Sequence, residues 1–155
     1  MHANTYKYPD FLAPQLVPST AWGSNLRAVL TPTEWKKVRL LIFKKHGEKC
    51  WFCKSKPKVL DCHEVWSYTY GTPNIQSLEN IIPLCKSCHA VCHIGFWSLK
   101  GPEYFDKYSK HLAKVRKITL DLAHKEISNA FKIHEQMSQV EWELDISCLE
   151  QITKG

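Results

Sequence analysis

Two Cys-x-x-Cys pairs constrain this chain more than any other feature of its sequence. Cys50 and Cys53 form the first pair, and Cys85 and Cys88 form the second. The chain has seven cysteines, and an odd number argues against a closed disulfide framework. Four thiolates from two tight pairs match the closed tetrahedral ligand set of a structural Zn²⁺. We therefore predict one structural zinc site that holds the intervening segment at both ends.

Length and composition indicate one compact domain with extensions. The sequence has 155 residues, of which 44% are hydrophobic and 12% aromatic, enough for a packed core. No apolar run reaches the length of about 18 residues expected of a membrane-spanning helix. The polar N-terminus, interrupted by prolines, lacks the apolar centre of a signal peptide. We expect a cytoplasmic protein with no membrane partner.

The apolar pattern divides the chain into three parts and predicts an α+β fold. Residues 1–30 carry several prolines and no sustained period, which is typical of an extended arm. Residues 31–100 hold both cysteine pairs and form the predicted core. Residues 101–155 are expected to add helices and an edge strand, packed as part of the same domain.

Local signals predict the individual elements of these parts. Thr31, Pro32 and Glu34 have the order of an N-cap, a first-turn proline and a capping-box glutamate. Residues 141–146 alternate between apolar and acidic side chains, as a half-buried strand does. The expected elements are a helix from Thr31, a short strand over 59–64, a loop through 71–74, a helix from near Ser87 past His93 towards Gly95, a helix over 103–117, a helix from Thr119 and a strand over 141–146.

Positive charge is concentrated around the first cysteine pair. The formal net charge is +6, and the Lys and Arg residues of 36–58 accompany a single acidic residue, Glu48. Such a stretch is either a solvated face or a surface that binds phosphates, and the sequence favours neither strongly. The candidate nucleic-acid-binding residues are Lys44, Lys45, Lys54, Lys56 and Lys58.

The residues between and after the cysteine pairs follow a defined order. His63 lies between the pairs, Asn80 precedes the second pair, and His89 follows Cys88 directly. This order, and the run NIIPLCKSCH in particular, resembles the HNH nucleases, zinc-stapled members of the ββα-metal class, over about residues 35–95. The resemblance implies a small zinc-bound ββα-metal core flanked by helices.

The resemblance also implies a role for each matching residue. His63 would be the general base that takes a proton from the water attacking a phosphodiester. Asn80 would orient that imidazole. His89, with His93 one helical turn further on, would bind a catalytic Mg²⁺, Mn²⁺ or Ni²⁺ ion. The implied substrate is nucleic acid, with DNA favoured over RNA, held through its backbone by the lysines named above.

One position departs from the family pattern. The family usually places Asp, Glu or His immediately before the base, whereas this chain has Cys62, and a thiolate is a poor ligand for Mg²⁺. On a strand, Asp61 would project to the same side as His63, whereas Glu64 would project to the other side. Either residue would replace the missing ligand only with a local bend of the strand. Asp61 is our candidate for an additional ligand.

Two other functions fit parts of the sequence. An HNH-like fold without cleavage would bind nucleic acid, a nucleotide or a protein, and the departure at Cys62 motivates this alternative. A zinc deaminase would use Cys62, Cys85 and Cys88 as ligands and Glu64 as proton shuttle. That arrangement leaves Cys50 and Cys53 without their partners.

The helices predicted after residue 101 would supply either substrate specificity or the surface of a homodimer.

Overall fold

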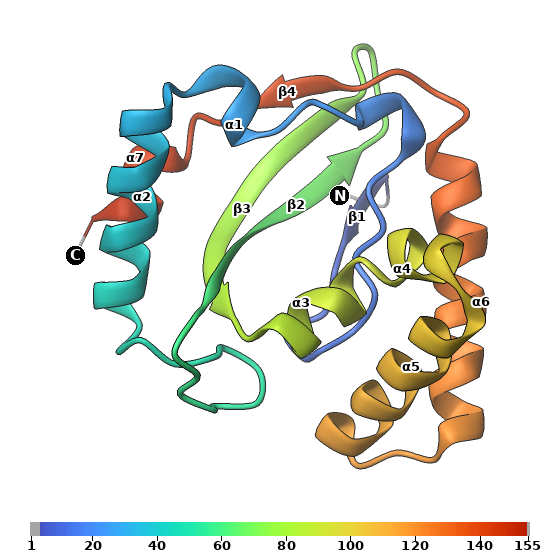
Figure 1. Cartoon of the computed structure of the whole chain (residues 1–155). Coiled ribbons are helices and arrows are strands. Elements are labelled where there is room, and N and C mark those ends of the chain that lie inside the picture. The colour runs from blue at the N-terminus through green and yellow to red at the C-terminus, as the bar shows by residue number, and fades with distance from the viewer. Residues whose placement is uncertain (1–3, 155) are drawn as a thin grey trace.

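The computed structural model describes residues 4–154 and shows an α+β fold around one four-stranded sheet (Figure 1). The strands lie in the order β1 (Thr5–Lys7), β2 (Asp61–Thr69), β3 (Ile75–Leu84) and β4 (Glu143–Asp145). β2 pairs antiparallel with β1 and β3, and β4 pairs parallel with β3. The predicted fold class is confirmed, and so is an edge strand from the C-terminal part.

The β2–β3 hairpin forms the centre of the sheet. β2 is longer than the strand predicted over residues 59–64, because β1 and β3 pair with its two edges as far as Thr69. The predicted loop is present, and within it the Gly71 N–H donates to Asn74 Oδ1 at 2.9 Å. α3 (Lys86–Cys92) follows β3 directly, so that β2, β3 and α3 form a ββα unit.

The helix predicted to run past His93 is two helices. α3 ends at Cys92 and α4 (Ile94–Lys100) begins immediately afterwards, because His93 leaves helical geometry with φ −105° and ψ 35°. The His93 carbonyl accepts the Phe96 N–H at 3.0 Å and so starts the new helix. His93 therefore lies at a junction between helices, one turn after His89.

The N-terminal residues are more structured than the predicted arm. Leu12 and Leu16 are buried in the core, and Arg116 Nη1 donates to the Leu12 carbonyl at 2.9 Å. The Gln15 N–H donates to the Cys92 carbonyl at 2.9 Å, which fixes this segment against α3. Besides β1, the segment contains a short 3-10 helix (Ser19–Ala21) and α1 (Leu26–Val29).

Helices flank the sheet on two sides in Figure 1. α2 (Pro32–Lys45) and α7 (Leu149–Thr153) lie on one side, and α3, α4, α5 (Pro102–Arg116) and α6 (Leu120–Met137) lie on the other. α2, α5 and α6 confirm the predicted helices, including the Thr31 and Thr119 caps. One buried cluster joins the cysteine pairs to α3–α6, and a second lies between α2 and the sheet.

Within residues 4–154, no helix has the length and apolarity needed to cross a membrane.

The capping box of α2 gives a first testable prediction. The Thr31 hydroxyl accepts the Glu34 N–H at 3.1 Å, and Glu34 Oε1 accepts the Thr31 N–H at 2.8 Å. We expect Thr31→Ala to lower the free energy of unfolding by about 1 kcal/mol in denaturant titration, because it removes one acceptor of a helix N–H group. Thr33→Ala, in the first turn of the same helix, is the matched control and should be neutral. Equal effects of the two changes would contradict the capping role.

Candidate metal centres

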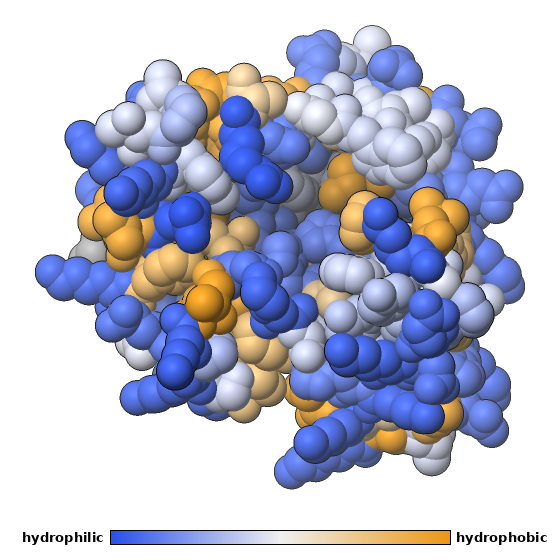
Figure 2. Space-filling view, in the orientation of Figure 1, coloured by the Kyte–Doolittle hydropathy of each residue, from blue (hydrophilic) through white to orange (hydrophobic). Residues whose placement is uncertain are grey.

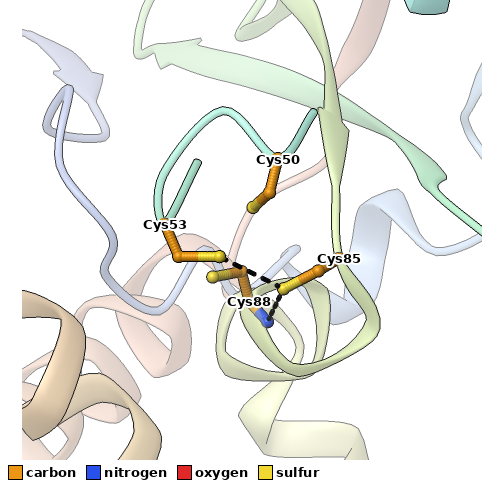
Figure 3. A group of neighbouring side chains, drawn as sticks. All are labelled: Cys50, Cys53, Cys85 and Cys88. Atoms are coloured by element: carbon orange, nitrogen blue, oxygen red, sulfur yellow. Dashed lines mark hydrogen bonds between the residues drawn. The ribbon is translucent and has the colours of Figure 1, made fainter. Parts of the chain in front are cut away.

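The four cysteines of the two pairs come together at one end of the hairpin. Figure 3 shows Cys50 and Cys53 on the loop that follows α2, facing Cys85 at the end of β3 and Cys88 in α3. Their sulfur atoms all lie within 4.8 Å of one another. Cys50 and Cys88 are buried, while Cys53 and Cys85 are half-buried. The predicted grouping is therefore present, and it leaves out Cys62, which the deaminase arrangement needs as a ligand.

The cluster fits a zinc ion in size and in chemistry. Tetrahedral Zn–S bonds of about 2.3 Å place sulfur atoms about 3.8 Å apart, and the Cys53 and Cys85 Sγ atoms are 3.7 Å apart. Hydrogen bonds from the Cys85 and Cys88 thiols lower the pKa of Cys50 well below its usual range, while the same contacts raise the pKa of Cys85 and Cys88. The four sulfur atoms by themselves therefore favour one thiolate, at Cys50. The site has the properties of a structural zinc site.

Donors around the cluster support the sulfur atoms. The Cys88 N–H donates to Cys85 Sγ at 3.4 Å, so Cys85 both joins the cluster and caps α3. The Ser55 hydroxyl lies 3.1 Å from Cys53 Sγ, and His111 Nε2 lies 3.3 Å from Cys88 Sγ. Such outer contacts orient metal ligands and stabilise their charge. His111 also joins α5 to the cluster.

Three histidines form a second cluster on the neighbouring part of the ββα unit. His63 on β2, His89 on α3 and His93 at the α3–α4 junction each bring a ring nitrogen within 4.8 Å of the other two. Their ring centroids are 4.8 to 5.3 Å apart. Imidazole nitrogens in this arrangement are a ligand set for a divalent transition metal. The structure thus brings together three residues that the sequence analysis selected.

Hydrogen bonds fix the orientation of two of these rings. His63 Nε2 lies 2.7 Å from the Oε1 atom of Gln15, and both side chains are buried. His89 Nδ1 lies 2.9 Å from Asp61 Oδ2. When these nitrogens donate to the oxygens, His63 Nδ1 and His89 Nε2 keep their lone pairs. Carboxylate and amide partners of this kind orient the histidines of metal sites.

Burial keeps the imidazoles of His63 and His93 neutral. It lowers the pKa of His63 well below the usual histidine value, and the neighbouring His93 and His89 act in the same direction. Burial and the proximity of His89 lower the pKa of His93 to about 4. A neutral imidazole has a free lone pair, which both a metal ligand and a general base need. His63 and His93 are therefore ready for either role at neutral pH.

The structure gives other contacts to the remaining residues selected between the cysteine pairs. Asp61 contacts His89 and, at 3.3 Å, Lys86 Nζ; it lies outside the three-histidine cluster. Burial raises the pKa of Cys62 to about 12, so this residue stays a neutral thiol. Glu64 Oε1 accepts the Leu26 N–H at 2.9 Å. Asn80 Oδ1 accepts the Ile81 N–H at 2.9 Å, so the ring contact seen for His63 comes from Gln15.

A cleft opens over the histidine cluster. It has a volume of about 750 Å³, and Figure 2 shows this face of the molecule hollowed near its centre. His63, His89 and His93 line the cleft, together with Arg27 and His134. A smaller hollow of about 440 Å³ reaches His89 and His93 from the side of Asp61 and Lys86. The cluster is therefore open to small molecules and ions.

The five predicted nucleic-acid-binding lysines lie outside this cleft. Lys44 and Lys45 are exposed at the end of α2, and Lys54, Lys56 and Lys58 are exposed on the loop that carries Cys53. Lys45 Nζ donates to the Ile152 carbonyl at 2.9 Å, and Lys54 Nζ donates to the Trp51 carbonyl at 2.7 Å. Arg27, on α1, lines the cleft instead.

Gln15 is the residue that the sequence analysis missed. It lies 48 positions before His63 in a proline-rich segment and belongs to no motif, so no local signal marks it.

Compared with protein-family models, with curated proteins and with solved structures, the chain matches none of them. The candidate function therefore has to come from the two clusters and the cleft.

The cysteine cluster gives a second prediction. We expect the purified protein to hold one zinc ion per chain and to unfold on chelation, because zinc binding contributes on the order of 10 kcal/mol to the stability of such sites. Cys50→Ala with Cys53→Ala should lose the zinc and lower the melting temperature. Cys148→Ala is the control, since Cys148 is exposed and outside the cluster. Zinc retained in the double variant would favour the deaminase arrangement instead.

The Asp61–His89 contact gives a third prediction. Asp61→Asn should weaken Ni²⁺ binding at the histidine cluster by about 10- to 100-fold in calorimetric titration, because the orienting carboxylate is lost. The zinc content of the cysteine cluster should not change. Asp106→Asn is the matched control, since Asp106 is exposed on α5 and pairs with Lys110. Unchanged Ni²⁺ affinity in Asp61→Asn would show that the carboxylate does not support the site.

Proposed function

We propose that this protein is an HNH-type endonuclease that hydrolyses nucleic-acid phosphodiesters with a divalent metal ion. The observation that carries the proposal is the grouping of three imidazoles in a cleft, on a ββα unit held by four clustered cysteines. Burial keeps two of the three, His63 and His93, neutral. The order of His63, Asn80 and His89 in the sequence resembles that family. The cysteine cluster is assigned a structural role and the histidine cluster a catalytic one.

His63 is assigned the role of general base. Its Nε2–H contact with Gln15 leaves Nδ1 to accept a proton from the attacking water. As the ring becomes an imidazolium, the Gln15 carbonyl oxygen 2.7 Å away stabilises the developing positive charge. Burial disfavours that charge before the reaction and keeps the base free. Gln15 thus performs the orienting role that the resemblance gave to Asn80.

His89 and His93 are assigned as ligands of the catalytic ion. When bound, the ion would stabilise negative charge on the scissile phosphate and on the leaving oxygen. Asp61 fixes His89 from outside the ligand set and so contributes without contacting the ion. Imidazole nitrogens suit Ni²⁺ better than Mg²⁺, which prefers oxygen ligands. Of the ions that the resemblance implies, we expect Ni²⁺ to support more activity than Mg²⁺.

Arg27 is assigned to the substrate phosphate. It is exposed, lines the cleft, and lies close enough for its charge to act on both His93 and Glu64. Its guanidinium can form paired hydrogen bonds with phosphate oxygens. The lysines on α2 and on the loop after it would add salt-dependent affinity for more distant phosphates. DNA remains the favoured polymer.

A cleavage assay tests the proposal. We expect the protein to nick plasmid DNA with Ni²⁺ or Mn²⁺, and His63→Ala to slow cleavage by at least about 100-fold, because general-base catalysis contributes that much or more. His124→Ala is the matched control, since His124 stacks on Phe105 and does not line the cleft. The rate of nicking is measured on gels.

Metal binding separates the two roles within the histidine cluster. His89→Ala should abolish Ni²⁺ binding, whereas His63→Ala should retain it and lose only cleavage. Equal loss of Ni²⁺ in both variants would make His63 a third ligand. Cleavage that survives His63→Ala would refute the nuclease, and so would the absence of cleavage of both plasmid and single-stranded DNA with every ion. The alternative motivated by Cys62, an HNH-like protein that binds without cleaving, would then be the better account.

A further inference from the structure

We propose that the cleft binds an unpaired nucleotide with its base against an apolar wall, so that the preferred substrate is single-stranded nucleic acid. The inference rests on the function proposed above and adds the class of substrate to it. Four large apolar side chains with substantial exposure surround the cleft: Trp22 at 67%, Phe96 at 55%, Leu99 at 84% and Phe131 at 37%. Figure 2 shows apolar side chains beside the hollow on the side of α4.

Trp22 is exposed but held in place. Its Nε1–H donates to the Val17 carbonyl at 2.9 Å, and this hydrogen bond fixes the indole at the edge of the cleft. Together with the other exposed apolar side chains around the cleft, this indole leaves apolar surface that a partner can cover. A fixed aromatic ring that keeps its face open is a surface on which a base can stack at little cost in entropy.

Another part of the wall comes from α4 and α6. A Cβ atom at Gly95 would lie 3.3 Å from Leu16 Cδ2 and 3.6 Å from Phe131 Cε1, so the Phe131 ring packs close to the α4 backbone at this glycine. Lys100 Nζ lies 5.0 Å from the centroid of the Phe96 ring and adds a positive charge to this wall. The wall is therefore both aromatic and electropositive.

The charges of the cleft match a nucleotide better than an apolar peptide. Arg27 is at the rim and the three imidazoles are on the floor. Among the lining residues that the structure describes, Glu64 is the acidic one, and its Oε1 is engaged by the Leu26 N–H. Phosphate contacts at Arg27 and base stacking at Trp22 and Phe96 are the two interactions that proteins combine to bind single strands.

The size of the cleft also limits its occupant. About 750 Å³ lies within the range of roughly 300–1,000 Å³ of pockets that hold small ligands. Such a space accommodates one or two nucleotides in which the bases are separated from their neighbours. In a duplex the base faces are covered by stacking, so they cannot contact Trp22 or Phe96 unless the base leaves the helix.

Binding to short fluorescent DNA oligonucleotides tests the inference, without added divalent ion so that the strand stays intact. The probes are a single strand, its duplex, and an abasic strand with the same number of phosphates, followed by fluorescence anisotropy. We expect the single strand to bind at least about fivefold more tightly than the abasic strand, because base–aromatic stacking contributes at least that much. The duplex should also bind more weakly than the single strand.

Substitutions assign the effect to the wall. Trp22→Ala and Phe96→Ala should weaken binding of the normal strand about fivefold or more and leave the abasic strand unchanged. Phe11→Ala is the matched control: Phe11 is 50% exposed and outside the cleft lining. If the wild-type protein bound normal and abasic strands with equal affinity, the inference would be overturned. It would also be overturned if both Trp22→Ala and Phe96→Ala bound the normal strand as tightly as the wild type.

The outcomes separate this inference from the proposed function. Cleavage of duplex DNA as fast as of single strands, with no base-dependent binding, would overturn the single-strand preference and leave the nuclease standing. Base-dependent binding of single strands without cleavage by any ion would support the aromatic wall and refute the nuclease.

Discussion

The association of the two cysteine pairs is the constraint on which the rest of the structure depends. Cys50 and Cys53 follow α2, whereas Cys85 and Cys88 belong to the end of β3 and the start of α3, so one cluster joins segments that flank the whole hairpin. Cys85 Sγ also accepts the Cys88 N–H and caps α3. The ligand geometry therefore fixes where α3 begins and which way it points, and with it the position of His89 and His93.

The histidine cluster combines three separate parts of the fold. β2 supplies His63, α3 supplies His89 and leads to His93, and the N-terminal segment supplies Gln15. Burying His63 and Gln15 is tolerable because each satisfies the other; leaving either polar group unpaired would cost about 1–3 kcal/mol. The same contact selects the tautomer of His63. The hydrogen bond between Gln15 and His63 therefore both stabilises the buried ring and leaves its Nδ1 atom free to act as a base.

The cleft places polar and apolar surface in separate regions. Imidazoles cover the floor, while exposed aromatic and aliphatic side chains from the N-terminal segment, α4 and α6 form the walls. The break between α3 and α4 at His93 contributes to both the floor and the walls of the cleft, because it ends the helix that carries His89 and starts the helix that carries Phe96 and Leu99. In a single uninterrupted helix, His89, Phe96 and Leu99 would all project from one straight helix axis.

The sequence by itself determined the features that depend on neighbouring residues. Cys-x-x-Cys spacing predicts the zinc site, a Thr–Pro–x–Glu run predicts the start of α2, and the order of His63 and His89 around the cysteines selects most of the histidine cluster. Only the tertiary structure decided that Gln15 contacts His63, that Asp61 supports His89, and that Trp22 faces the same cleft as Phe131. The reason is physical: caps and metal knuckles are set by bonds within a few residues. Contacts between residues tens of positions apart depend on how buried surfaces pack, and no short pattern records that.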